Sequence, residues 1–192
     1  MTRGEGYLKE RAMRTAQPFT GTTRQLRPSD LPRFREHLLR LDAASRRDRF
    51  NGVINDACVA AYAARCFADG TTVIGYVENG RVLGAAELHE RPDDKMPTGE
   101  IAFSVERELQ HRGIGSRLFE RLIVNALGLG YIRLFVTTHR DNSAMKSLAR
   151  KFGADMVFEQ GETMGIIDLA PFIVSFSLEF ATAKAASLSD VA

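Results

Sequence analysis

Residues 100–136 read EIAFSVERELQHRGIGSRLFERLIVNALGLGYIRLFV, and this stretch decides the fold. It predicts a strand over Glu100–Val105 and a second strand over Tyr131–Val136, which is rich in β-branched and aromatic residues. Between them, apolar residues recur at helical spacing over Gly113–Leu127, and Gly128 and Gly130 end the helix. A helix that connects two parallel strands forms a crossover, and such crossovers are nearly always right-handed. The sequence therefore predicts an α/β fold with the helix start at the carboxyl end of the first strand.

The loop before this helix has the composition of a phosphate-binding site. Gly113 and Gly115 have no Cβ atom, so a ligand can approach their backbone closely. The free amides at a helix start and the positive end of the helix dipole suit a pyrophosphate, and Arg112 adds charge. The loop is neither a P-loop nor a complete GxGxxG, because GIGSRL lacks the third glycine. On the glycine pair alone, a tight strand-to-helix turn is an equal alternative.

The rest of the chain alternates between helix and strand signals. Ser45–Phe50 is predicted to be a charged connector, and Arg91–Gly99 is predicted to be a loop. The other predicted elements are a strand at 22–27, a helix beginning near Ser29-Asp30, a helix at Asp56–Phe67, a hairpin of Thr72–Val77 and Val82–Leu88 around Asn79-Gly80, a helix at Asn142–Lys151, and a strand pair at Asp155–Glu159 and Thr163–Asp168.

The length and charge limit the classes of function. A chain of 192 residues with 44% hydrophobic residues fits one domain, over residues 21–170, with an N-terminal arm at 1–20 and an extension at 171–192. The net charge of +2 argues against a general nucleic-acid binder. No apolar run is long enough for a membrane span, and residues 1–20 lack a signal-peptide core, so we expect a cytoplasmic protein with no membrane partner.

The cysteines and histidines predict neither a disulfide nor a metal site. Cys58 and Cys66 lie about two turns apart on one predicted helix, too far for a disulfide, and are expected to be small buried side chains. The four histidines show no metal-ligand spacing.

Two longer segments carry a family resemblance. SVERELQHRGIGSRLFERLI at 104–123, followed by YIRLFVTTHRDNSAMKSLARKFGA at 131–154, resembles the Gcn5-related N-acetyltransferase (GNAT) family. Gln110, Gly113 and Gly115 fill its (Gln/Arg)-x-x-Gly-x-(Gly/Ala) loop, and the order of predicted elements also matches. The resemblance implies a single-domain fold with a mixed, splayed sheet of about six or seven strands, flanked by about four helices. It also implies that acetyl-CoA binds in the splay.

A narrower resemblance lies upstream. The Leu-x-x-x-Ser-x-x-x-Arg-Phe spacing of Leu41, Ser45, Arg49 and Phe50 is similar to the start of acetyltransferase domains in bacterial protein-lysine acetylases.

The resemblance also implies the site residues. Asn142 matches an asparagine that commonly contacts the cofactor, although a helix N-cap is an equal interpretation. The implied cofactor contacts are Phe103, Ser104, Val105, Gln110, His111, Arg112, Gly113, Ile114, Gly115, Ser116 and Asn142.

Acetyl transfer to an amine needs a base, because a free lysine is almost entirely protonated at pH 7. The family often places a glutamate on its fourth strand for this purpose, and Glu100 is the match. Its alternative role is a partner in an ion pair, and Glu87 on the preceding strand is the reserve candidate. Many members also carry a tyrosine in the last helix as the acid for the leaving thiolate, but Ala149 occupies that position here.

The leading hypothesis is an acetyl-CoA-dependent N-acetyltransferase that acts on a protein lysine or a small amine, with no metal. Two alternatives stay open: an acetyl-CoA sensor with weak catalysis, which the missing tyrosine favours, and an interaction domain without cofactor. A homodimer also stays open.

Overall fold

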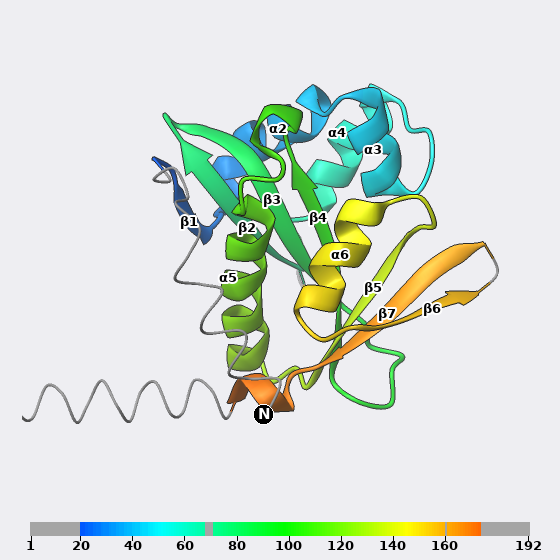
Figure 1. Ribbon diagram of the computed structural model, residues 1–192. Helices are drawn as coiled ribbons and strands as arrows, with labels where there is room; N and C mark the ends of the chain where they lie inside the picture. The colour runs from blue at the N-terminus through cyan, green and yellow to red at the C-terminus, as the bar shows by residue number, and fades with distance from the viewer. Residues whose placement is uncertain (1–19, 68–70, 160, 174–192) are drawn as a thin grey trace, which may run out of the picture.

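The structure is a computed structural model that describes residues 20–67, 71–159 and 161–173. Its centre is one seven-stranded sheet in the order β1-β2-β3-β4-β5-β7-β6 (Figure 1). Neighbouring strands are antiparallel except for β4 and β5, which are parallel. The strands are β1 (Thr22–Gln25), β2 (Thr71–Glu78), β3 (Arg81–Glu90), β4 (Thr98–Val105), β5 (Arg133–His139), β6 (Asp155–Glu159) and β7 (Glu162–Asp168).

The helices cover both faces of this sheet and enclose two apolar cores. Side chains of α5 and α6 form one core against one face, and side chains of α2 and α4 form the second core against the other face. In the described part of the chain the α-helices are α2 (Leu31–Arg40), α3 (Ala43–Phe50), α4 (Asp56–Arg65), α5 (Ile114–Gly128) and α6 (Ser143–Lys151), and short 3-10 turns lie at Pro28–Asp30 and Arg107–Leu109.

The long helix α5 forms as its apolar spacing predicts. Ile114, Leu118, Leu122 and Ala126 are all at most 2% exposed, and they form the stripe that packs on the sheet. An apolar stripe at this spacing stabilises a helix mainly through the surface that it buries.

The parallel pair β4–β5 separates after a short contact. The pairing runs only from Thr98 with Arg133 to Glu100 with Phe135. Beyond Glu100, the segment 101–105 of β4 stays paired with β3 but has no partner on β5. The sheet is therefore mixed and splayed, and the predicted α/β fold class is confirmed.

Several predicted boundaries were wrong. The segment Ser45–Phe50 is not a connector but most of α3, because Asp42 caps that helix by accepting hydrogen bonds from the amides of Ala44 and Ser45. Helix α3 is additional to the four helices expected, and among the described residues 170–173 are helical as well. Strand β5 begins at Arg133 and runs on to His139. Apart from Thr20 and residues 171–173, the predicted arm and extension lie outside the described residues.

The search for a membrane span, made over the same described ranges, found no helix with the length and apolarity to cross a bilayer.

The two cysteines differ in exposure, so the expectation that both are buried was wrong for Cys58. Cys66 is buried, whereas Cys58 is exposed, and both are free thiols. The buried positions of α4 are Val59 and Ala63, one turn apart, and Cys58 lies off that face. Burial raises the pKa of the Cys66 thiol to about 12.

We therefore expect one fast-reacting thiol in the native protein. An aromatic disulfide reagent at pH 8 should modify Cys58 at once and Cys66 only after denaturation, because the thiolate is the reactive form. The Cys58→Ser variant should then show no fast-reacting thiol. Two fast thiols in the native protein would contradict the burial of Cys66.

Candidate active site

The loop before α5 offers unused backbone donors. Gly113 is the N-cap of α5 with a left-handed φ of 91°, and no side chain caps the helix there. His111 also has a positive φ, of 59°. A helix start without a side-chain cap leaves its first amides free for an anion. The glycine pair therefore forms a tight turn, and this turn does not exclude the binding of an anion at the free amides.

Gln110 shapes this loop from within. Its Nε2 atom donates to the carbonyl of Val105 at 3.0 Å and to Ser45 Oγ at 3.1 Å. These two bonds connect the loop to the end of β4 and to the start of α3. The Gln110 side chain therefore holds the loop in shape. It also contacts α3, and the loop motif in the sequence did not indicate this contact.

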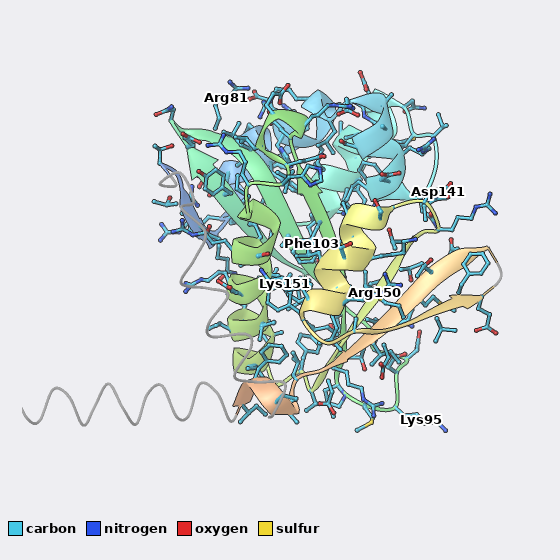
Figure 2. The ribbon with its side chains drawn as sticks, viewed as in Figure 1. Arg81, Lys95, Phe103, Asp141, Arg150 and Lys151 are labelled. Carbon is cyan, nitrogen blue, oxygen red and sulfur yellow. The ribbon has the colours of Figure 1, made fainter. Side chains whose placement is uncertain are left out.

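The other loop residues divide into exposed polar groups and one apolar contact. His111 and Arg112 are exposed, whereas Ile114 is 2% exposed and packs into the core. Ser116 Oγ accepts a hydrogen bond at 2.8 Å from Lys151 Nζ on α6 (Figure 2). Lys151 thus brings a further positive charge to the start of α5. The sequence analysis missed it, because the contact joins residues 35 positions apart.

The side chains at the end of β4 are used for packing. Phe103 stacks on Phe119 of α5 with ring centroids 4.9 Å apart. On the opposite face, Ser104 Oγ lies 2.9 Å from His37 Nε2 on α2. Burial lowers the pKa of His37 although Glu106 lies beside it, so this imidazole is neutral at pH 7. The backbone groups of 101–105 that pair neither with β3 nor with Gln110 are what remain for a ligand in the splay.

Glu100 lies at the point where β4 and β5 separate. It is the last residue of β4 that pairs with β5, and its side chain is 42% exposed. Its Oε2 atom accepts a hydrogen bond from Arg91 Nη1 at 3.2 Å, and the Arg91 guanidinium stacks over Phe135 at 4.2 Å. The ion-pair interpretation of Glu100 is therefore correct, and the carboxylate remains partly exposed.

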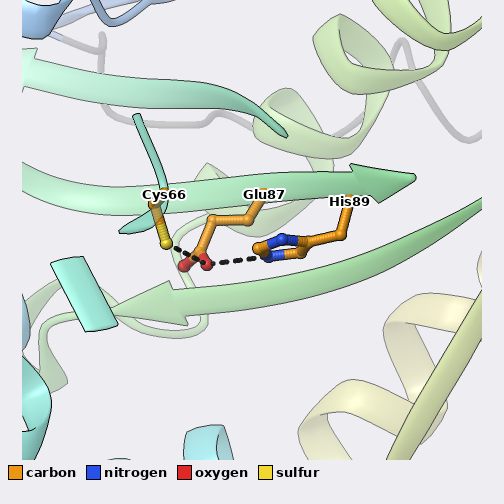
Figure 3. A group of neighbouring side chains, drawn as sticks. All are labelled: Cys66, Glu87 and His89. Carbon is orange, nitrogen blue, oxygen red and sulfur yellow. Dashed lines mark hydrogen bonds and ion pairs between the residues drawn. The ribbon is translucent and has the colours of Figure 1, made fainter. Parts of the chain in front are cut away.

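Glu87, the reserve candidate, lies in a buried polar cluster (Figure 3). Its Oε2 atom accepts hydrogen bonds from Arg49 Nη2 at 2.5 Å and from the Tyr62 hydroxyl, and His89 Nε2 lies 3.2 Å away. Its Oε1 atom is buried and has no hydrogen-bond partner among the described residues. Burial alone would raise the pKa of Glu87, but Arg49 and His89 lower it to about 2. This carboxylate is therefore a weak base, and its Oε2 atom is already hydrogen-bonded to its neighbours.

One side of the cluster has the donor set of a metal site, which the sequence spacing did not indicate. One ligand atom each from Cys66, Glu87 and His89 lies within 4.8 Å of the others. The guanidinium of Arg49 already supplies a positive charge to the same Glu87 oxygen, and the raised thiol pKa keeps Cys66 protonated. Arg49 and Glu87 are 8% and 0% exposed, so the cluster is best described as a buried ion pair between α3 and β3.

Helix α3 lies across the splay. It contacts both β4 and β5, Ser45 at its start accepts from Gln110, and Arg49 in its last turn binds Glu87. After the helix, the Asn51 side chain donates to Glu162 on β7. Ser45 and Arg49, four residues apart in the Leu-x-x-x-Ser-x-x-x-Arg-Phe spacing, therefore lie on the same side of α3. Their hydrogen bonds hold this helix over the opening between β4 and β5.

The Arg49–Glu87 pair predicts an acid-dependent loss of stability. The pKa of Glu87 falls from 4.5 to about 2 on folding, so the pair stabilises the fold above pH 4.5 and this contribution is lost as the pH falls toward 2. The shift corresponds to a free energy of unfolding on the order of 3 kcal/mol. Urea unfolding between pH 5 and pH 2 should show a shallower pH dependence for Glu87→Gln than for the wild type. An unchanged pH dependence would contradict the assignment, and exposed Glu90→Gln is the control.

The last helix carries no acid at the expected position. Ala149 is 0% exposed and lies in the core beside Phe152. At the start of this helix, Asn142 Oδ1 accepts from the amide of Met145 at 2.9 Å, so its N-cap role is confirmed. The neighbouring Leu148 lies close to Gly115, where a Cβ atom would meet it at 3.4 Å. The start of α5 thus lies beside the C-terminal half of α6.

Comparisons with known proteins agree with this geometry. The acetyltransferase (GNAT) family matches the chain over residues 36–154. The acetyltransferase Pat of Mycolicibacterium smegmatis is 40% identical over 73 residues, which make up 38% of this chain and 22% of that protein, so the match spans about a fifth of that relative.

Solved structures share the fold. The GNAT domain of S. lividans PAT has a TM-score of 0.67 at 19% identity and covers 77% of this chain and 90% of its own. The putative acetyltransferase yncA of Salmonella typhimurium, solved with acetyl-CoA, has a TM-score of 0.58 at 20% identity and covers 78% of this chain and 94% of its own. With the family matched over more than half of its length, the chain belongs to the GNAT family of acetyltransferases.

Proposed function

We propose that this protein binds acetyl-CoA in the β4–β5 splay and transfers the acetyl group to an amine, either a protein lysine or a small molecule. The observation that carries the proposal is the combination of two donor sets at one edge of the sheet. These are the backbone groups of residues 101–105 that have no partner on β5, and the uncapped start of α5 at Gly113. The first suits an amide-rich chain laid along a strand, and the second suits a pyrophosphate.

The reaction is a direct attack on the thioester. The neutral amine nitrogen bonds to the acetyl carbon and gives up a proton, the carbon–sulfur bond breaks, and coenzyme A leaves as a thiolate that takes up a proton. Only about one lysine in 2,500 is neutral at pH 7, so a base must remove a proton from the ammonium. We assign this step to Glu100, because its carboxylate is accessible at the point where the strands separate. Backbone amides of 103–105 would polarise the thioester carbonyl.

The remaining contacts follow from the same placement. The loop residues Gln110, His111, Arg112, Gly113, Ile114, Gly115 and Ser116 would surround the pyrophosphate, with Gln110 and Ile114 holding the loop in shape. Asn142 would contact the cofactor while it caps α6. Metal chemistry has no place in this scheme, because attack by a neutral amine on a thioester needs only a base and a polarised carbonyl.

The test is release of free coenzyme A thiol when acetyl-CoA and a panel of amines are supplied. The panel should contain lysine-bearing peptides, polyamines and amino sugars. Amine-dependent thiol release supports the proposal. If acetyl-CoA binds but no amine is turned over, the second candidate replaces it: a sensor that binds acetyl-CoA with little catalysis. The buried Ala149, in place of an acid for the thiolate, favours that candidate.

A further inference from the structure

A basic cavity lies beside α6, on the side that faces β6. Its volume is about 380 Å³, and it is lined by Arg140, Asp141, Lys146, Arg150, Met156, Phe158 and Thr163. Three of the lining side chains are cationic and one is anionic. The anion, Asp141, also lies 3.5 Å from His139 and 3.7 Å from Arg140. The cavity therefore keeps an excess of positive charge that suits an acidic ligand.

This cavity is distinct from the cofactor loop. Lys146 and Arg150 are one turn apart on α6, and helical geometry turns them about 100° or more away from Lys151, which contacts Ser116 at the start of α5. Lys146 Nζ donates to the carbonyl of Arg140, so the cations of the helix and of the β5–α6 loop are held together. The described residues provide no hydrogen bond or ion pair to the side chain of Arg150.

The apolar side of the cavity belongs to an edge strand. Strand β6 pairs only with β7 and ends the sheet, so one row of its backbone groups is unpaired by any described strand. Its Val157 and Phe158 side chains are each 59% exposed. Exposed apolar edges of this kind pair readily with an added strand.

From these observations we infer that the β6 edge and the basic cavity together bind an extended acidic segment of the acceptor protein. In an extended chain, alternate side chains point to the same face, so one face of an added strand can carry only acidic side chains. Carboxylates on one face of an added strand would then lie on the side of the two cations, and its apolar side chains, on the other face, would cover Val157. The inference rests on the proposed acetyl transfer only for naming the partner as the acceptor.

A second copy of this chain fits the edge less well. If β6 paired with β6 of another molecule about a twofold axis normal to the sheet, the same face of both molecules would lie on one side. Arg140, Lys146 and Arg150 of each copy would then approach one another, and like charges repel. Charge complementarity therefore favours an acidic partner.

The test is binding of a fluorescent peptide in which glutamate and valine alternate, measured by anisotropy at low salt without acetyl-CoA. Because no turnover is needed, failure of this inference is distinct from failure of the proposed reaction. Double charge reversal, Lys146→Glu with Arg150→Glu, should weaken peptide binding by about tenfold or more. Reversal of two exposed charges elsewhere, Arg81→Glu with Arg121→Glu, is the matched control and should bind like the wild type.

Further measurements decide the mode of binding. A peptide with N-methyl groups on one backbone edge should lose binding, since strand addition needs those amides. The inference is overturned if the double variant binds the peptide as well as the wild type, or if N-methylation has no effect. It is also overturned if the variant instead loses acetyl-CoA affinity, or if it abolishes a concentration-dependent dimer, because the occupant would then be the cofactor or a second copy.

Discussion

Replacement of Gly113 by glutamate is expected to raise the Kd for acetyl-CoA by about a hundredfold or more. Gly113 is the N-cap of α5, and its backbone lies beside the free amides that would hold the pyrophosphate. A glutamate there adds a side chain in the space of the ligand and a negative charge against two phosphates. The measurement is a calorimetric or fluorescence titration with acetyl-CoA.

Gly130→Glu is the matched control for this variant. Gly130 has a φ of 84°, close to the 91° of Gly113, and lies at the other end of the same helix with open space where its Cβ would be. Both variants therefore impose the same backbone strain and the same charge on α5. If the two variants bind acetyl-CoA equally well, the loop does not recognise the pyrophosphate.

Replacement of Glu100 by glutamine is expected to lower the rate of acetyl transfer by about a hundredfold or more, with the affinity for acetyl-CoA unchanged. The amide keeps the shape of the side chain but does not accept a proton at neutral pH. The loss should shrink as the pH rises toward the pKa of the amine, because more of the acceptor is then already neutral. Initial rates of thiol release from pH 7 to pH 10 provide the measurement.

Two other glutamates provide the comparison for this variant. Glu90→Gln changes an exposed carboxylate at the end of β3 and should retain the wild-type rate. Glu87→Gln tests the reserve base, with rates normalised to folded protein by circular dichroism. Full activity in Glu100→Gln would remove that residue from the role, and a selective loss in Glu87→Gln would move the role to the buried cluster.

Much of the fold could be predicted because its signals are local. The apolar stripe of α5, the Asn79-Gly80 turn and the alternating strands each depend on neighbours within a few residues. Helix α3 was missed because its sequence, AASRRDRF, has no apolar stripe. It is instead held by its Asp42 cap and by bonds from Ser45 and Arg49 to residues far away in the sequence.

The candidate site likewise contains residues with local sequence signals and residues that only the folded chain brings together. The glycine loop has a short motif, and Glu100 matches a position on the fourth strand of the family that the sequence resembles, so both could be named from the sequence. The cluster around Glu87 could not, because Arg49, Tyr62 and Cys66 come from two helices that meet on β3 only in the folded chain. Lys151 at the start of α5 and the cavity beside β6 likewise depend on how α6 packs.

The most direct test of the account is a titration of the protein with acetyl-CoA, with no amine present. Binding of one acetyl-CoA per chain, accompanied by a rise in Tm at excess ligand, is the result that we predict. The absence of both binding heat and a Tm shift, at ligand concentrations well above the millimolar range, would contradict the assignment of the loop at Gln110–Gly115 and of the splay beside it.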